Sequence, residues 1–196
     1  MDKETLLAYD LRAAAFAQEW SDQPPPLDLQ EILLSYFTPG PTADIGCGSG
    51  RETAWLNSQG FPTLGYDPSA GLLEEARLLY PGLHFDLAAL PELEGIPRGI
   101  FDNVVCETVI MHLPVAVIGS SVASLVSLLR PGGVLYLSWR VTEGAGKRDE
   151  HGRLYSAFDP ALIMRQLDGL EVLLDEKVVS ESSGKVVRRV VVRMPG

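Results

Sequence analysis

Apolar residues along the chain change their spacing near residue 40. Up to that point they recur at helical intervals, which predicts one helix over residues 4–20 and a second over residues 27–37. The proline-rich stretch at 23–26 separates the two helices, and Pro39-Gly40 ends the second. Beyond residue 40, short apolar runs alternate with longer segments of helical periodicity. We therefore expect residues 1–38 to form a helical cap on a domain of another kind.

The alternation beyond residue 40 predicts strands joined by helices. The expected strands are 42–46, 62–66, 83–85, 103–106 and 134–139, and the expected helices are 52–59, 69–80 and 115–129. Because connections of this length can hold a helix, consecutive strands run parallel and the helices cover both faces of the sheet. The continuous apolar run at 134–137 is typical of a strand buried on both faces.

The C-terminal part has a different pattern. A helix is expected over 160–167, followed by strands over 171–179 and 186–193. Only the turn at 180–185 joins these two strands, so they must be antiparallel. Valines of one parity in the last strand, interrupted by Arg188, indicate a position inside the sheet rather than on its rim.

Composition and charge narrow the function. A chain of 196 residues suits a single domain over 1–196, and 46% hydrophobic residues can build a sizeable core. Its 16 Lys and Arg against 26 Asp and Glu give a net charge of −10, which argues against nucleic-acid partners because their binding rests on basic contacts. The start lacks the apolar core of a signal peptide, and no apolar run is long enough for a membrane span. We expect a cytoplasmic monomer or homodimer with no membrane partner and, because Cys47 and Cys106 lack metal-ligand spacing, no metal.

A glycine-rich segment follows the first expected strand and opens a helix. Glycines here let the backbone approach a ligand closely, and the helix start offers unpaired N–H groups. A dinucleotide fingerprint would place its third glycine at Arg51, whereas this chain has glycines at 46, 48 and 50. It also has Asp44 two residues before the first glycine, and that acid has no place in the dinucleotide pattern. A plain glycine-rich turn would explain the glycines alone.

This segment resembles the first motif of the Rossmann-like, class I S-adenosylmethionine-dependent methyltransferases. Asp67, 17 residues after Gly50, resembles the family's acid that grips both ribose hydroxyls, although Asp67 or Ser69 could also cap the next helix. The segment 84–91 looks like the one in which an Asp, here Asp86, hydrogen-bonds the adenine amine and the backbone of the next residue, Leu87, faces the ring.

Two later segments extend the resemblance over residues 42–140, the cofactor-binding half. Residues 101–113 match a strand that begins Phe-Asp, ends near the sulfonium and is followed by a loop often carrying His. Residues 128–135 match the structural turn L-x-P-G-G. The resemblance implies a three-layer αβα sandwich with a mostly parallel seven-stranded sheet and a reversed C-terminal strand. It implies S-adenosyl-L-methionine as cofactor, S-adenosyl-L-homocysteine as product, and cofactor contacts from Tyr9, Arg12, Asp44, Gly46, Cys47, Gly48, Gly50, Asp67, Pro68, Asp86, Leu87, Glu107 and Thr108.

Residues for the acceptor are expected beyond the carboxyl ends of the strands. His112 is a candidate general base because its ordinary pKa lies near neutrality, or it caps the next helix or contacts the cofactor. The polar segment 141–158 is a candidate lid, and its Arg148 and Tyr155 are candidate catalytic residues. Its arginines suggest an anionic acceptor, or they pair with acids of a solvated loop. Residues 159–196 form the C-terminal helix and hairpin.

The sequence therefore predicts methyl transfer to a small molecule, possibly anionic. A dinucleotide oxidoreductase is disfavoured by the missing third glycine and by the antiparallel tail. A protein or tRNA methyltransferase stays open, as does a non-catalytic adenosylmethionine-binding module that regulates a partner.

Overall fold

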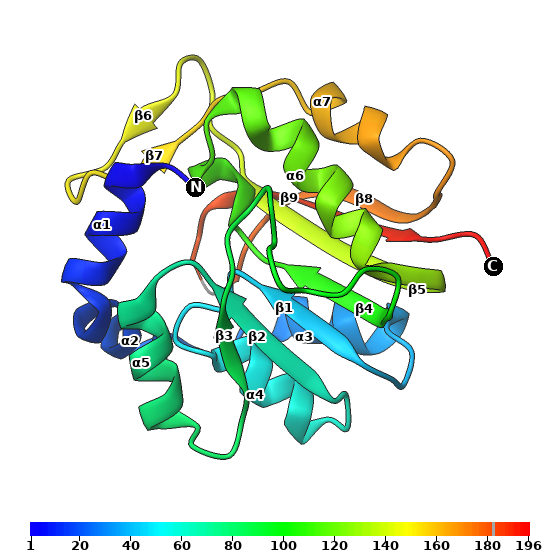
Figure 1. Ribbon diagram of the computed structural model, residues 1–196. Helices are drawn as coiled ribbons and strands as arrows, with labels where there is room; N and C mark the ends of the chain where they lie inside the picture. Colours follow the sequence, from blue (N-terminus) through cyan, green and yellow to red (C-terminus); the bar gives the residue numbers. More distant parts are fainter. Residues whose placement is uncertain (182) are drawn as a thin grey trace.

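A seven-stranded sheet forms the centre of the molecule (Figure 1). The computed structural model describes residues 1–181 and 183–196. The strand order is β3-β2-β1-β4-β5-β9-β8, and only β9 runs against the others. The strands are β1 Thr42–Ile45, β2 Thr63–Asp67, β3 Phe85–Leu87, β4 Phe101–Cys106, β5 Leu129–Arg140, β8 Glu171–Val179 and β9 Val186–Arg193.

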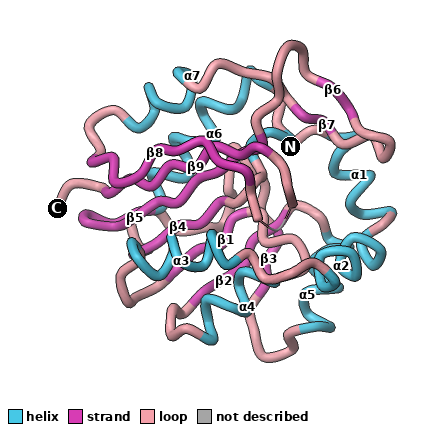
Figure 2. The backbone as a smooth tube through the Cα atoms, turned by 180° about the vertical axis from the view of Figure 1, so that it is seen from behind, coloured by secondary structure: helices cyan, strands magenta, loops and turns pink. Residues whose placement is uncertain are grey.

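The alternation of side chains in each central strand decides which helices cover which face. Leu135 and Leu137 of β5 lie in the core beneath α6 (Val115–Leu128) and α7 (Ala161–Met164), which continues into the 3-10 turn η2 (Arg165–Leu167). Val134 and Tyr136 lie in the opposite core, beneath α3 (Leu27–Tyr36) and α4 (Arg51–Ser58). Figure 2, from behind, shows α3 and α4 in front of the sheet. The predicted three-layer αβα sandwich is confirmed.

The C-terminal hairpin agrees with the sequence pattern in extent and position. Strand β9 pairs antiparallel with both β5 and β8, so it lies inside the sheet as its valine parity predicts. The reversed strand distinguishes this sheet from an all-parallel dinucleotide-binding sheet. The predicted turn at 180–185 contains residue 182, which lies outside the described residues.

Several predicted element boundaries differ from the structure, and those of β3 and β5 are instructive. Strand β3 covers 85–87 instead of 83–85, pairing Phe85 with Gly65. Only Phe85 of its three residues is buried, so this edge strand has little apolar pattern to reveal it. Strand β5 starts five residues before the predicted 134, at Leu129, because Phe101 of β4 already pairs there.

The first part of the N-terminal cap consists of two helices where one was predicted over 4–20. Helix α1 (Lys3–Leu11) and helix α2 (Ala13–Asp22) meet at Arg12, whose φ of −127° and ψ of 21° break the helical path. Tertiary contacts fix this junction, because Asp10 accepts hydrogen bonds from Ser69 Oγ and from the Gly71 amide at the start of α5 (Ala70–Leu79). Helical periodicity continues through such a break, so the sequence pattern does not report it.

The candidate lid, residues 141–158, contains a short two-stranded ribbon. Strands β6 (Lys147–Arg148) and β7 (Leu154–Tyr155) pair antiparallel and lie beside α1 (Figure 1). A 3-10 turn, η1 (Ile110–His112), lies next to β7, because the Ser156 amide donates to the Met111 carbonyl. Among the described residues, no helix has the length and apolar character needed to cross a membrane.

Candidate functional site

The glycine-rich turn joins β1 to α4 in a conformation that needs glycine. Gly48 and Gly50 have φ values of 54° and 85°, in the left-handed region that other residues rarely adopt. A Cβ on Gly50 would lie 2.7 Å from the Phe85 ring, so that glycine packs against the protein. Gly48 instead faces the side chain of Trp20, from α2. Gly48, in the middle of the turn, therefore faces the cavity side that it shares with Trp20.

Asp44 fastens this turn to the helix that follows it. Its side chain is buried and its Oδ2 accepts a 2.7 Å hydrogen bond from Thr53 Oγ1 in α4. Burial raises the pKa of Asp44 to about 8, although the bond from Thr53 opposes the shift. Asp44 thus holds the turn in place through Thr53, and it also lines the cavity described below.

Asp67, at the end of β2, is the polar centre of the site. Its Oδ2 accepts from the Gly48 amide at 2.9 Å and its Oδ1 from the Ser69 amide at 2.8 Å. Burial raises the pKa of Asp67 to about 6, against the lowering effect of both amides. A carboxylate offers about four acceptor positions, so two remain for hydroxyl groups of a ligand. Asp67 and Ser69 also hold the start of α5 in place. Asp67 accepts from the Ser69 amide, and Ser69 Oγ caps the helix by accepting from the Leu72 amide.

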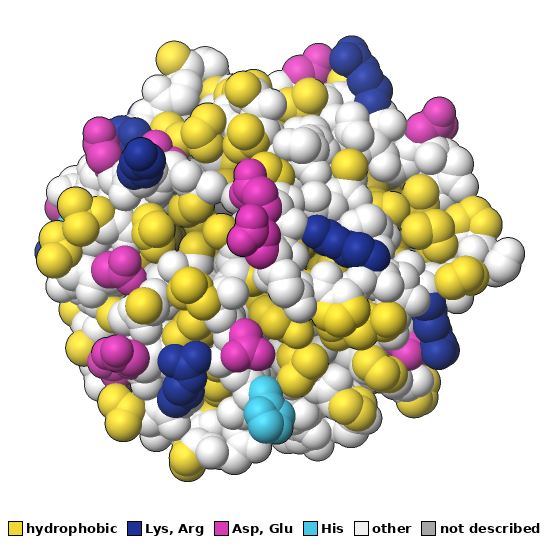
Figure 3. All heavy atoms as spheres, in the orientation of Figure 1, with side chains coloured by type: hydrophobic (Ala, Val, Ile, Leu, Met, Phe, Trp, Pro, Cys, Tyr) yellow, Lys and Arg dark blue, Asp and Glu magenta, His cyan; other side chains and the backbone are white. Residues whose placement is uncertain are grey.

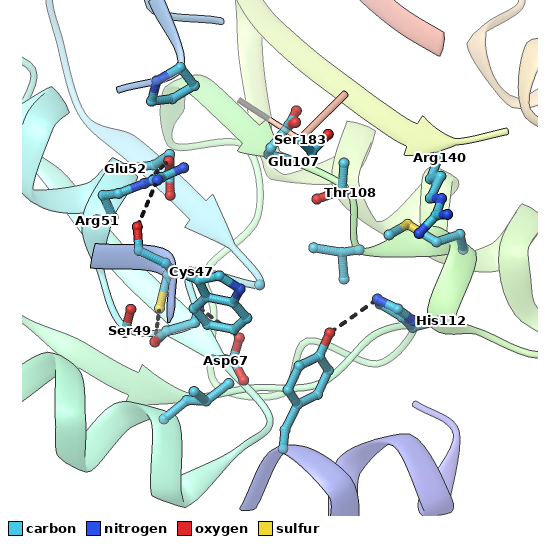
Figure 4. A pocket seen from close by; sticks show the side chains of 18 of the residues that line it. Cys47, Ser49, Arg51, Glu52, Asp67, Glu107, Thr108, His112, Arg140 and Ser183 are labelled. Atoms are coloured by element: carbon cyan, nitrogen blue, oxygen red, sulfur yellow. Dashed lines mark hydrogen bonds and ion pairs between the residues drawn. The ribbon is translucent and has the colours of Figure 1, made fainter. Parts of the chain in front are cut away.

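A cavity of about 270 Å³ lies over the carboxyl ends of β1, β2, β4 and β5. Figure 4 shows labelled side chains reaching it from opposite sides, with Cys47 and Asp67 on one and His112 and Arg140 on the other. The structure brings ten of the predicted site residues to this cavity: Tyr9, Asp44, Gly46, Cys47, Gly48, Asp67, Glu107, Thr108, His112 and Tyr155. It does not bring the other six to the cavity wall: Arg12, Gly50, Pro68, Asp86, Leu87 and Arg148.

His112 is held in one tautomer by its neighbours. Its Nδ1 lies 2.5 Å from the Leu154 carbonyl oxygen, which can only accept, so Nδ1 carries the proton. Its Nε2 is then the acceptor, and Tyr9 donates to it across 3.1 Å (Figure 4 draws this bond at the labelled His112). Burial lowers the pKa of His112 to about 4. At neutral pH the ring is therefore uncharged, with a basic lone pair at the cavity wall.

Two arginines line the same end of the cavity. Arg153 stacks over the rings of Phe16 and Tyr9 at 4.6 and 5.6 Å, and its Nε lies 2.7 Å from Asp149. The Arg140 guanidinium lies 5.0 Å from the centre of the Tyr155 ring. Within the part of the chain that the structure describes, no carboxylate forms an ion pair with Arg140.

Arg148, which the sequence indicated as catalytic, is engaged elsewhere. Its guanidinium lies 2.8 Å from Asp2 and 3.1 Å from Glu4, so it joins the β6–β7 ribbon to the start of α1. The hydrogen bond from Arg148 holds the pKa of Asp2 well below its ordinary value. Arg148 therefore does not contact the cavity and affects it only by joining the β6–β7 ribbon to α1.

Glu107 forms a second buried polar group at the end of β4. Its Oε2 accepts a 2.7 Å hydrogen bond from Tyr136 and another from Ser138, both on β5. Burial raises the pKa of this carboxyl above its ordinary value. Sequence reasoning missed these two partners, although their alternating positions in β5 place them on one face of the strand. It also treated Trp20 only as an apolar helix residue.

Metal-binding side chains do not cluster in the described chain. Across residues 1–181 and 183–196, no three His, Cys, Asp or Glu side chains come together in a way that could hold a metal ion. The titratable side chains that line the cavity include four carboxylates, one histidine and three arginines: Asp44, Glu52, Asp67, Glu107, His112, Arg51, Arg140 and Arg153.

Comparison with known proteins connects this site to a family. Residues 43–137 match the family model described as a methyltransferase domain. A ubiquinone biosynthesis O-methyltransferase of Xanthomonas euvesicatoria pv. vesicatoria is 30% identical over 139 residues, 64% of this chain and 57% of the relative. A trans-aconitate 2-methyltransferase of Deinococcus radiodurans is 35% identical over 115 residues, covering 57% of this chain and 42% of the relative. The chain thus spans about half the length of these curated relatives.

Solved structures share the fold across nearly the whole chain. The 1,6-didemethyltoxoflavin-N1-methyltransferase of Burkholderia thailandensis, solved with S-adenosylhomocysteine, has a TM-score of 0.71 at 21% identity and covers 97% of this chain and 88% of its own. The phosphoethanolamine N-methyltransferase 2 of Haemonchus contortus has a TM-score of 0.76 at 14% identity, over 100% of this chain and 61% of its own. These solved structures show the fold. The matching methyltransferase domain and the curated relatives, together with the sheet order, place the chain in the Rossmann-like S-adenosylmethionine-dependent methyltransferases.

Proposed function

We propose that this chain transfers a methyl group from S-adenosylmethionine to an anionic small molecule. The observation that carries the proposal is that the two ends of one cavity carry different side chains. One end has the glycine-rich turn and Asp67, which suit a nucleoside, and the other has a neutral histidine and two arginines, which suit an acid. The curated relatives support it, since one of them is named for trans-aconitate, a tricarboxylate.

For the cofactor we propose a path along the ends of β2, β1 and β4. Asp67 accepts hydrogen bonds from the ribose hydroxyls, and the backbone of the turn lies beneath the ligand. The buried carboxylate of Glu107 faces the methionine end, where its charge suits the cofactor's ammonium or sulfonium. The remaining contacts follow from the family resemblance, and those that line the cavity are Tyr9, Asp44, Gly46, Cys47, Gly48 and Thr108. The resemblance also implies Arg12, Gly50, Pro68, Asp86 and Leu87, which lie outside the cavity wall.

For the reaction we propose that the protein accelerates methyl transfer mainly by positioning the acceptor against the cofactor. The sulfonium already activates the methyl group, so the protein has to align the acceptor and exclude water. When the acceptor is an alcohol or phenol, its proton passes to His112 Nε2 as the bond to carbon forms and the carbon–sulfur bond breaks. Arg140 binds the acid group of the acceptor, because no carboxylate of the described chain forms an ion pair with its guanidinium. The guanidinium lies over the ring of Tyr155, which fixes its position.

The segment 141–158 acts in this proposal as a lid over the acceptor. It supplies Arg153 and Tyr155 to the cavity wall, and the Arg148–Asp2 pair anchors it to α1. Arg148 is accordingly proposed as a positioning residue for the lid, and the contact with the acceptor's acid is assigned to Arg140 and Arg153.

Surface charge supports a small acceptor over a nucleic acid. On the face drawn in Figure 3, basic side chains stand singly among acidic, apolar and neutral ones. The net charge of −10 acts in the same direction, because nucleic-acid binding needs many basic contacts.

The proposal is tested in two steps. Calorimetry first compares S-adenosylmethionine with NAD, and binding of NAD alone would contradict the cofactor assignment. A screen with methyl-labelled cofactor then compares hydroxy acids with their neutral amides. We expect Arg140→Gln to raise the KM for the acid by about tenfold or more, and to leave the KM for the amide unchanged. Cofactor binding without any turnover would indicate a regulatory module, and labelling of protein or tRNA fractions would indicate a macromolecular acceptor.

A further inference from the structure

The turn between β8 and β9 contributes a cation to the wall of the cavity. Lys185 lies at the end of this turn and lines the cavity together with Ser180 and Val187. Figure 4 labels Ser183, from the same turn, among the side chains around the cavity. The Ser180 amide donates a 2.9 Å hydrogen bond to the Lys185 carbonyl, which extends the pairing of β8 with β9 beyond Val186. The backbone at Lys185 is therefore held in register with the sheet.

Lys185 and Arg140 are neighbours on adjacent strands. Arg140 is the last residue of β5 and lies opposite Val187 of β9, and the Val141 amide donates to the Val186 carbonyl. Because Lys185 comes two residues before Val187, it is a diagonal neighbour of Arg140, with Cα atoms roughly 7–8 Å apart. Residues two apart along a strand point to the same face, so both basic side chains extend from one face of the sheet. Both line the cavity.

The basic side chains of the cavity wall differ in whether a carboxylate neutralises them. Among the described residues they are Arg51, Arg140, Arg153 and Lys185. Arg51 pairs with Glu52 at 2.8 Å, and Arg153 pairs with Asp149 at 2.7 Å. Within residues 1–181 and 183–196, no carboxylate forms an ion pair with Arg140 or Lys185. The two cations that lack a carboxylate partner are thus the two that lie side by side.

Ring contacts separate Arg140 and Lys185 into two binding positions. The guanidinium groups of Arg140 and Arg153 lie 5.0 and 6.0 Å from the centre of the Tyr155 ring, so these two arginines can share one acid group. Lys185 extends from the neighbouring strand and has no ring contact of this kind with Tyr155 in the described chain. Two like charges this close repel each other, and a ligand with a second negative group relieves that repulsion.

We propose that the methyl acceptor carries two carboxylates and that Lys185 binds the second of them. Arg140 and Arg153 bind the first carboxylate, and Lys185 selects diacids over acids with a single charge. Lys185 is therefore a specificity-determining residue that contacts the substrate, while proton transfer stays with His112. The inference rests on the proposed function, because it takes the anionic acceptor from it.

Binding of matched acids to the complex with S-adenosylhomocysteine tests this selection without requiring turnover. The probes are succinate, glutarate and phthalate, each compared by NMR titration with the monoacid of the same skeleton, which is butyrate, valerate or benzoate. We expect at least one diacid to bind about tenfold or more tightly than its monoacid. Lys185→Gln should remove that advantage and leave the affinity for the monoacid unchanged. Equal affinity for every diacid and its monoacid in the unaltered chain would overturn the inference.

Charge-matched variants separate a contact from a general effect of charge. Lys177→Gln is the control, because it removes the same charge from an exposed position of the neighbouring strand β8 that does not line the cavity. Lys185→Arg keeps the charge and should keep most of the preference for diacids. Arg140→Gln should instead weaken diacids and monoacids alike, since both use the first position. An equal loss of diacid binding in Lys177→Gln and Lys185→Gln would overturn the contact with Lys185.

Failure of the inference can be told apart from failure of the proposed function. If monoacids bind and Arg140→Gln weakens them, the anionic acceptor stands, and only the role of Lys185 depends on the diacids. If the complex with S-adenosylhomocysteine forms but binds no acid of either kind, the anionic acceptor itself is overturned. Melting temperatures of all variants confirm that each of them is folded.

Discussion

The two ends of the cavity are held together in different ways. At the nucleoside end, Asp67 bonds the amides of Gly48 and Ser69, which lie 19 and 2 residues away along the chain. At the acceptor end, Tyr9 reaches His112 across 103 residues, and Arg148 reaches Asp2 across 146. Short-range backbone bonds make the first end a fixed part of the sheet. The second end depends on side chains from segments that each fold elsewhere, so we expect it to open and to vary more readily.

The largest expected effect is on cofactor affinity, when Asp67 at the nucleoside end is replaced. In the proposed function, Asp67→Ala removes two charge-assisted hydrogen bonds to the ribose, each worth about 1.5–3 kcal/mol, so affinity for S-adenosylmethionine should fall by at least about 100-fold. Calorimetry measures this, with circular dichroism to confirm folding. Glu74→Ala, at an exposed position of α5, is the control. An unchanged affinity in Asp67→Ala would show that the cofactor contacts another part of the cavity.

The next effect concerns His112 at the acceptor end. His112→Gln should slow transfer to a hydroxyl acceptor by about 10²–10⁴ while leaving cofactor affinity nearly unchanged. Burial lowers the pKa of His112 to about 4, so the ring stays neutral and kcat at saturating cofactor should hold from neutral pH down towards that value. The KM for the cofactor should rise earlier, near pH 6, because that is where Asp67 takes up a proton. A kcat that fell already near the ordinary histidine pKa would contradict the buried, neutral base.

Replacing Glu143–Arg153 by a short Gly-Ser linker separates the two ends. The linker removes Arg148 and Arg153 but leaves the glycine-rich turn intact. Turnover should drop by about 100-fold because near-attack alignment is lost, and cofactor affinity should stay within about twofold. Full turnover in this variant, measured with an acceptor from the screen, would mean that the segment is not a lid.

The smallest effect concerns the anchor between the lid and α1. Arg148→Ala should change the melting temperature little at neutral pH, since the guanidinium is exposed and the pair is screened by solvent. The lowered pKa of Asp2 means that its contribution is present above the ordinary aspartate pKa and is lost as the pH falls below it. Melting curves of the two proteins should therefore converge in acid. Curves that stayed apart at every pH would show that Arg148 stabilises the chain by another route.

Local sequence patterns predicted the nucleoside end and most of the sheet. The acid and glycines of residues 44–50 and the acid at 67 are short-range signals, because each belongs to a turn directly after its strand. The hairpin of β8 and β9 was predicted with its bounds, since a short link forces two strands to pair. The bounds of the edge strand β3 were predicted two residues too early, and the break at Arg12 was not predicted, because neither feature changes the apolar periodicity.

Sequence by itself thus determined the order of strands and helices, the reversed strand and the position of the glycine-rich turn directly after β1. Only the tertiary structure decided that His112 carries its proton on Nδ1, that Trp20 lies on Gly48, and that Arg148 pairs with Asp2 outside the cavity. The physical reason is the range of the interactions. Periodicity and turn chemistry act between near neighbours in the chain, whereas a side chain's burial and bonding partner depend on segments that meet only when the whole domain has packed.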